Sequence, residues 1–207
     1  NYLRGDQSNE ITNGGGFRNR SHLLGDIIDS GPVYVGTSDA LYTDSSYNSY
    51  ISSTKTRTPM LYIGSNDGML HAFNANTGNE LFAFIPNGVF SNLLNLTSTA
   101  YNSSHLFFVD GSPQAGDVQY TDGTWHTLLV GGENAGGKTV FALDITTPQN
   151  LTTETLLSQS VLWEFSDADM GYSFSKPTIA RVNATASPFA VFFGNGYNSA
   201  NNKAILY

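Results

Sequence analysis

Short apolar runs separated by turn residues dominate the sequence, and the densest set lies between residues 60 and 86. The apolar runs of this set cover residues 60–63, 69–73 and 81–85. An Asn-Asp-Gly turn ending at Gly68 joins the first two runs, and an Asn-Thr-Gly turn ending at Gly78 joins the next two. Asp-Gly between apolar runs is a strong hairpin signal, because both central turn residues need positive φ. The pattern predicts three antiparallel strands, most of a propeller blade, with Gly68 and Gly78 at positive φ.

The same strand-and-turn unit recurs along the chain. An apolar run that ends in glycine occurs at residues 32–36, 61–64, 128–132 and 190–194. After three of these runs, a Gly/Asn turn leads into a further apolar run, at 69–73, 139–143 and 203–207. The units lie farther apart than the roughly 40–50 residues of a typical blade, which predicts long loops at 37–58 and 87–124. Helical periodicity is weak, and only residues 89–96 are expected to form a short helix.

These patterns predict an all-β fold, namely a β-propeller that is incomplete in this chain. We expect a single domain over residues 1–207 with roughly three to four blades, in which residues 1–30 form a lead-in segment. Because the chain has no initiator Met and no signal peptide, we expect it to come from a longer protein. Period-two alternation and aromatic bulk predict the buried strand positions. These are Tyr62, Ile63, Leu70, Ala72, Phe73, Leu129, Val130, Phe141, Leu143, Val191 and Phe193.

Composition narrows the possible partners. The net charge is −8, and the nine Lys and Arg residues do not cluster, so nucleic acid and anionic membrane surfaces would be repelled. No apolar stretch reaches the ~18 residues that a membrane span needs. Cysteine is absent, which excludes disulfides and thiolate chemistry.

One nucleotide-binding motif lacks the helix that it needs, and one calcium-binding motif lacks some of its ligands. Residues 132–139 match the P-loop pattern, but the β-branched and aromatic run that follows predicts a strand where phosphate binding needs a helix, so we interpret the segment as a hairpin. Residues 167–178 begin like a calcium loop, with Asp167 and Asp169. They then place Gly171 at a ligand position and Thr178 where a bidentate carboxylate belongs, so this loop is not expected to bind calcium.

An enzymatic function finds little support in the residues. The four histidines are isolated, and no G-x-S-x-G elbow occurs. His71 lies within a predicted strand and is expected to be a structural histidine with satisfied hydrogen bonds. No catalytic, cofactor-binding or metal-ligating residue is therefore assigned.

Seven segments in order resemble the PilC/PilY family of type IV pilus tip adhesins. They are NYLRGDQSNE (1–10), FRNR (17–20), LLGDIIDSGPVYVG (23–36), YIGSNDGMLHAFNANTGNE (62–80), VDGSPQAGDV (109–118), WHTLLVGGENAGGKTVFALDITTP (125–148) and VFFGNGYNSANNKAILY (191–207). The resemblance implies blades of the quinoprotein-like type. It also implies an exported, non-catalytic protein at the pilus tip or outer cell surface, which supports pilus assembly and retraction, twitching motility and adhesion. Pilin and minor pilins are the implied partners, and calcium is implied through an Asp-rich loop beyond Tyr207.

Two alternatives to this function stay open. A quinoprotein-like, PQQ-type dehydrogenase shares the blade type, although the vicinal cysteines of such enzymes are missing and tryptophans are few. A periplasmic propeller scaffold is the other alternative.

The only candidate receptor-binding residues are Arg4, Gly5 and Asp6, the tripeptide that integrins recognise. Such recognition would use the Asp6 carboxylate on a receptor-bound metal ion and Arg4 in an acidic pocket, with Gly5 permitting the bend. The simpler alternative is that this segment only begins the domain, with Arg4 and Asp6 paired internally.

Overall fold

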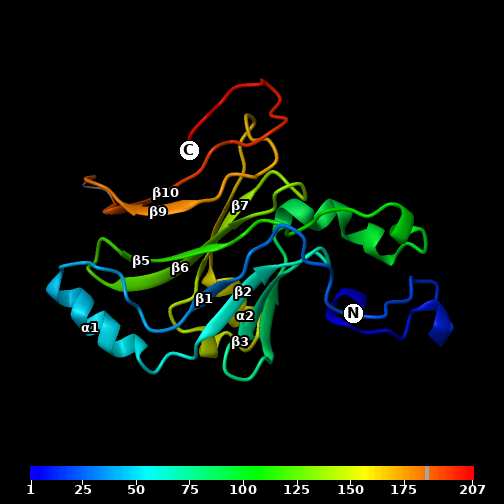
Figure 1. The fold of residues 1–207 in the computed structure, drawn as a ribbon, viewed down its shortest axis with the longest axis horizontal. Helices are drawn as coiled ribbons and strands as arrows, with labels where there is room; N and C mark the ends of the chain where they lie inside the picture. Colours follow the sequence, from blue (N-terminus) through cyan, green and yellow to red (C-terminus); the bar gives the residue numbers. More distant parts are fainter. Residues whose placement is uncertain (185–186) are drawn as a thin grey trace.

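The computed structural model describes residues 1–184 and 187–207, and its strands form successive antiparallel sheets (Figure 1). In the first sheet, β1 (Val33–Val35), β2 (Met60–Gly64), β3 (Leu70–Asn74) and β4 (Glu80–Phe84) lie in chain order. In the second, the order is β5 (Gln114–Gln119), β6 (Trp125–Gly132), β7 (Val140–Asp144) and β8 (Val161–Phe165). A third sheet pairs β9 (Thr178–Arg181) with β10 (Phe189–Phe192). Four-stranded meanders of this kind are propeller blades, so the all-β prediction is confirmed for the described residues.

The predicted hairpins of the first sheet are confirmed. Strands β2 and β3 pair antiparallel from Met60 opposite Asn74 to Gly64 opposite Leu70. Gly68 has φ 98° and Gly78 has φ 75°, as the turn sequences predict. These left-handed conformations favour glycine because it lacks a Cβ atom.

The largest hydrophobic core lies between the first two sheets. Leu70 and Phe84 on one side meet Leu129 and Phe141 on the other, and the rings of Phe84 and Phe141 lie 5.2 Å apart. Most of the predicted core positions are buried. Ile63, Phe73 and Val191 are only partly buried, which corrects that part of the prediction. Ile63 and Phe73 alternate with the residues of the shared core and therefore point to the opposite face of the first sheet.

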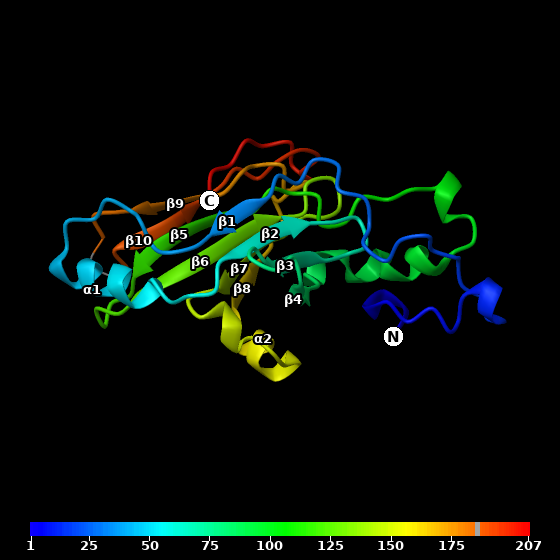
Figure 2. The ribbon, with the colours of Figure 1, turned by 60° about the horizontal axis from the view of Figure 1, so that its bottom comes forward.

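Hydrogen bonds join the first two sheets where their first strands begin. The Ser30 hydroxyl donates to the Gly111 carbonyl at 3.0 Å, and the Gly31 amide donates to the Ser112 hydroxyl at 2.8 Å. Both segments end in proline immediately before a strand, at Pro32 and Pro113. The strands that follow, β1 and β5, are in contact, so these two segments fix the sheets to each other at one end (Figure 2).

The helices differ from the sequence prediction. Helix α1 (Ser45–Thr54) lies inside the predicted loop 37–58, and α2 (Glu154–Ser160) precedes β8, so the expectation of a single helix is wrong. Predicted helix 89–96 is present as the 3₁₀ helix η3 (Asn87–Thr97). Shorter 3₁₀ turns are η1 (Tyr2–Arg4), η2 (Ile11–Asn13), η4 (Tyr101–Ser103) and η5 (Pro148–Asn150). The sequence of α1 is rich in weak helix formers, and the helix is stabilised by packing of Tyr47 and Tyr50 against Trp125.

Two other predicted segments also differ. The predicted loop 87–124 contains strand β5. The predicted strand 203–207 forms only one bridge, between Leu206 and Gly194. The rest of this segment has an irregular backbone.

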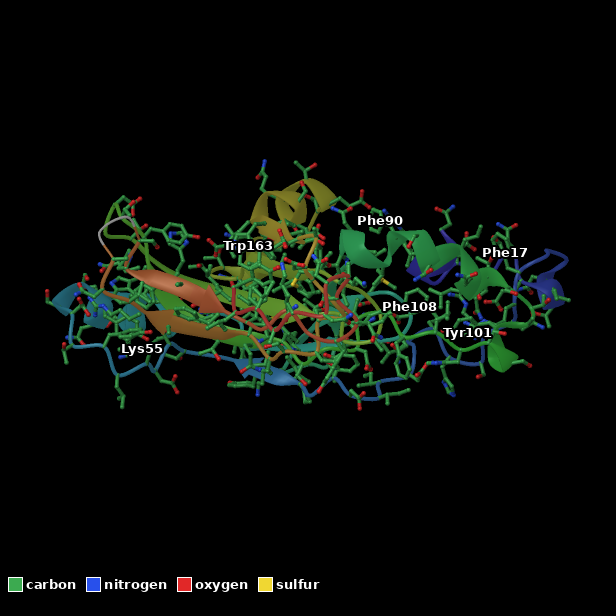
Figure 3. All side chains as sticks on the ribbon, turned by 90° about the horizontal axis from the view of Figure 1, so that it is seen from above. Phe17, Lys55, Phe90, Tyr101, Phe108 and Trp163 are labelled. Carbon is green, nitrogen blue, oxygen red and sulfur yellow. The ribbon has the colours of Figure 1, made fainter. Side chains whose placement is uncertain are left out.

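The long connections lie at opposite ends of the sheets (Figure 1). The N-terminal segment and η3 extend together from one end, while α1 covers the other. Figure 3 labels Phe17 and Tyr101 at the first end and Lys55 near the second. The end that carries the N-terminal segment also carries the candidate residues Arg4, Gly5 and Asp6.

Candidate functional site

The candidate tripeptide lies in a tight turn at the surface. Arg4 ends η1, and Gly5 caps it with φ 92°, a left-handed conformation that glycine accommodates. The Asp6 carboxylate accepts a hydrogen bond from the Ser8 amide at 2.9 Å, and this bond holds the pKa of Asp6 below its usual value. Arg4 pairs with Glu154 of α2, so Arg4 and Asp6 have different partners. The two side chains of the Arg4–Glu154 pair are 72% and 74% exposed, and such a pair contributes little to stability.

The segment behind this turn is rigidly anchored. Tyr2 is buried, and the Arg20 guanidinium lies 3.6 Å from the centre of its ring. Arg20 also pairs with the buried Glu10 carboxylate at 2.8 Å. Burial alone would raise the pKa of Glu10, but the hydrogen bonds and charge of Arg20 lower it. The Tyr2 hydroxyl donates to carbonyls of Arg18 and Leu96, which ties the turn to η3.

A cavity of about 580 Å³ opens beside Arg4 and Gly5. Its wall is formed by the face of the first sheet that points away from the second sheet, and by α2. The lining is mainly apolar and includes Leu23, Phe73, Leu81, Ile85 and Leu157. The exposed Arg4 and the partly buried Gly5 therefore lie at the rim of an apolar hollow.

One charged side chain is buried in this wall. His71 of β3 is enclosed between two carboxylates: its Nδ1 lies 2.5 Å from Glu80 and its Nε2 lies 3.0 Å from Asp67. Burial alone would lower the pKa of His71, but the hydrogen bonds and charges of Asp67 and Glu80 raise it to about 9. Asp67 also accepts the Gly25 amide at 2.8 Å, so the same group holds the N-terminal segment. His71 has the structural role that the sequence predicts.

The P-loop-like segment 132–139 forms a hairpin, as predicted. Strand β7 begins at Val140, and the Lys138 ammonium donates to the Asn198 carbonyl at 3.1 Å. The glycines make room for the carboxylate of Glu133, since a Cβ on Gly137 would lie 1.8 Å from a Glu133 oxygen. Glu133 is fully buried, accepts the Thr139 amide and hydroxyl, and has its pKa raised by burial to about 7.

The calcium-like start at 167–169 has its carboxylates engaged within the protein. Asp167 accepts the Tyr207 hydroxyl at 2.7 Å and the Asp169 amide at 2.9 Å, while Asp169 lies 3.6 Å from Lys203. Among residues 1–184 and 187–207, no group of three or more His, Cys, Asp or Glu side chains is arranged to hold a metal ion. No helix in the same ranges is long and apolar enough to cross a membrane.

Two features were not predicted from the sequence: the Arg4–Glu154 pair and the paired segments that join the first two sheets. Glu154, the partner of Arg4, could not be placed because α2 was not predicted. The paired segments that join the sheets do have a sequence signal, since Asp29 and Asp110 each stand three residues before a proline that precedes a strand.

Comparison with known proteins gives consistent matches. Residues 24–207 match the family described as the PilY1 beta-propeller domain. The chain is 45% identical to type IV pilus biogenesis factor PilY1 of Pseudomonas aeruginosa strain PAK, over 99% of this chain and 17% of that protein. It is 41% identical to a PilY1 homolog of Xylella fastidiosa, over 100% of this chain and 17% of that protein. The crystal structure of the P. aeruginosa PilY1 C-terminal domain matches with a TM-score of 0.64 and 40% identity, covering 84% of this chain and 33% of that one.

Proposed function

Because the chain belongs to the PilY1 beta-propeller family, we propose that it is a non-catalytic module of a type IV pilus biogenesis factor. The observation that carries this proposal is the 45% identity over 99% of the chain to a protein of that name. The chain spans about a sixth of the length of the curated relatives it matches, so the role of the whole protein is part of the proposal. In this proposal the sheets are blades of a larger, quinoprotein-like propeller. The one-third coverage of the solved domain supports the larger size.

In this function the sheets act as a rigid support for binding loops. The core between the first two sheets and the hydrogen-bonded segments at Ser30 and Ser112 fix the blades, and the long connections extend from their ends. Loops on a rigid scaffold are common sites of protein recognition. The proposed partners are pilin and minor pilins, at the pilus tip or outer cell surface. The proposed roles are pilus assembly and retraction, twitching motility and adhesion.

The tripeptide Arg4-Gly5-Asp6 is the proposed contact for a host-cell receptor of the integrin type. Arg4 is exposed while Gly5 and Asp6 are partly exposed, and Arg4 would need only to exchange the weak surface pair with Glu154 for an acidic receptor pocket. The hydrogen bond to Asp6 favours the ionised carboxylate that a receptor-bound metal ion requires. Calcium binding by an Asp-rich loop beyond Tyr207 is a separate proposal, which rests on the family resemblance.

The pilus role is tested by deleting the codons for residues 1–207 from the parent gene. We expect fewer surface pili and reduced twitching, and complementation with the intact gene should restore both. Intact piliation, motility and adhesion in the deletion strain would contradict the proposal. Oxidation of an alcohol by the purified protein with pyrroloquinoline quinone and calcium would instead favour a dehydrogenase.

The receptor contact is tested separately with an Asp6→Glu variant of the full-length protein. Lengthening the side chain displaces the carboxylate from a metal ion while keeping its charge. We expect cell binding to fall in this variant and to persist in Glu154→Gln, which only releases Arg4. Normal binding by Asp6→Glu would remove the tripeptide as the contact without affecting the pilus proposal.

A further inference from the structure

Asp110 is a buried carboxylate with an incomplete set of partners. It is 1% exposed and lies in the short segment that leads into the first strand of the second sheet. Its Oδ1 accepts the Asp29 amide at 3.1 Å, whereas its Oδ2 is buried and has no hydrogen-bond partner among the described residues. Burying an ionised carboxylate without a partner is costly, so an unpartnered buried oxygen of this kind requires an explanation.

A second acidic residue, Asp29, contacts Asp110 from the segment that leads into the first sheet. Burial raises the pKa of Asp110, and the nearby negative charge of Asp29 raises it further. The two residues occupy equivalent positions, three residues before Pro32 and Pro113, so the propeller repeat itself brings them together. Before Pro177, the equivalent position holds Phe174. The acidic pair is thus specific to the junction between the first two sheets.

Within the part of the chain that the structure describes, no basic side chain forms an ion pair with Asp29 or Asp110. The immediate surroundings are instead rich in neutral oxygen atoms. The Ser112 hydroxyl lies 3.3 Å from the Asp29 carbonyl, and the Ser30 hydroxyl lies 3.0 Å from the Gly111 carbonyl. Asn134 donates its side-chain amide to the Asp110 carbonyl at 3.0 Å, and hydrogen bonding by the same side chain partly offsets the rise in the pKa of Asp110. Carboxylate, carbonyl and hydroxyl oxygens are the ligands of hard divalent cations.

We propose that Asp29 and Asp110 bind a calcium-class divalent cation at the junction of the first two sheets. The ion would supply the positive charge that the protein lacks there, with Asp110 Oδ2 as the buried ligand and water completing the coordination. Two carboxylates make a weak site, and the affinities of extracellular calcium modules, about 10⁻⁴–10⁻³ M, are the appropriate range.

Such an ion would couple the N-terminal segment to the second sheet. Asp29 ends the segment that begins with the turn at Arg4, Gly5 and Asp6, whereas Asp110 lies in the segment that leads into the second sheet. Ion binding would therefore stabilise the position of that segment. The site is separate from any calcium loop elsewhere in the protein and does not depend on the proposed pilus function.

The test measures calcium binding by full-length protein that has first been stripped with a chelator. Equilibrium dialysis with radioactive calcium at millimolar concentration gives the number of ions bound per molecule for the wild type, Asp110→Asn and Asp29→Asn. We expect each variant to bind one ion fewer than the wild type. Asp122→Asn is the matched control, because Asp122 is an exposed carboxylate in the turn between β5 and β6 and caps Thr124. It should bind as many ions as the wild type.

Thermal unfolding provides a second readout, because the difference in stability between Asp110→Asn and the wild type should change sign when calcium is added. Without calcium, Asp110→Asn should be at least as stable as the wild type, because the variant removes a buried negative charge. With calcium, the wild type should gain stability at this site and Asp110→Asn should not. If Asp110→Asn folds poorly, Asp29→Asn still tests the proposal, because Asp29 is exposed and its replacement should not disturb folding. If the wild type and both variants bind equal numbers of ions, the proposal is wrong. The charge of Asp29 and Asp110 would then be neutralised by a proton that the two carboxyl groups share.

Discussion

Replacing His71 with glutamine should remove a buried positive charge from between two carboxylates. The imidazole is 6% exposed and contacts Glu80 at 2.5 Å and Asp67 at 3.0 Å. Burial opposes the charged form, but the two carboxylates outweigh it and raise the pKa of His71 from 6.5 to about 9. Glutamine can retain one hydrogen bond but carries no charge. The variant should therefore lose the electrostatic part of the interaction.

The size and sign of the effect follow from the difference in pKa between the folded and unfolded states. Each pKa unit corresponds to about 1.4 kcal/mol, so a rise from 6.5 to about 9 contributes about 3 kcal/mol to the free energy of unfolding. Because the pKa of His71 is raised on folding, the folded state binds its proton more tightly. This contribution is complete below pH 6.5 and is lost as the pH rises through 9.

Urea unfolding of the wild type and His71→Gln at about pH 6 and about pH 10 measures this contribution. We expect a large stability deficit of the variant at the lower pH and a much smaller deficit at the higher pH. His105→Gln, which removes a surface histidine paired with Asp26, is the control and should show a small difference at both. An equal deficit of His71→Gln at both pH values would refute the electrostatic reasoning and leave only a packing role.

Three further outcomes can be measured by chemical or thermal unfolding. Gly68→Val should destabilise the protein more than Gly78→Val, because both glycines have positive φ but only a Cβ at Gly68 meets a neighbouring side chain, at 2.6 Å; equal losses would refute the steric contact at Gly68. Tyr47→Phe should cost about 1–3 kcal/mol by removing the hydroxyl that donates to the buried Asp117 carboxylate, and an unchanged midpoint would argue against that bond. Glu133→Gln should gain stability relative to the wild type as the pH rises from about 5 to 8. The pKa of Glu133 is raised on folding to about 7, so the contribution of its proton to the free energy of unfolding is complete below pH 4.5 and is lost as the pH rises through 7; a constant difference between variant and wild type across this range would contradict this reasoning.

The strands were predictable where local signals agree with the fold. The turns at Gly68 and Gly78 and the apolar runs beside them specify the hairpins of the first sheet, because turn chemistry and strand alternation act over only a few residues. The hairpin at residues 132–139 was predictable for the same reason, since the β-branched run after Lys138 does not favour a helix. Helix α1 was not predictable, because its stability comes from distant aromatic contacts with Trp125.

The sequence by itself determined the strand-and-turn pattern, the family and the turn positions of this protein, because repeated short motifs encode local structure directly. Only the tertiary structure determined which charges meet. Glu154 reaches Arg4, and the Asp29 amide of the N-terminal segment reaches the Asp110 carboxylate. Residues far apart in the chain become neighbours only when the sheets pack, and the charge and burial around each group are set by that packing rather than by its sequence neighbours.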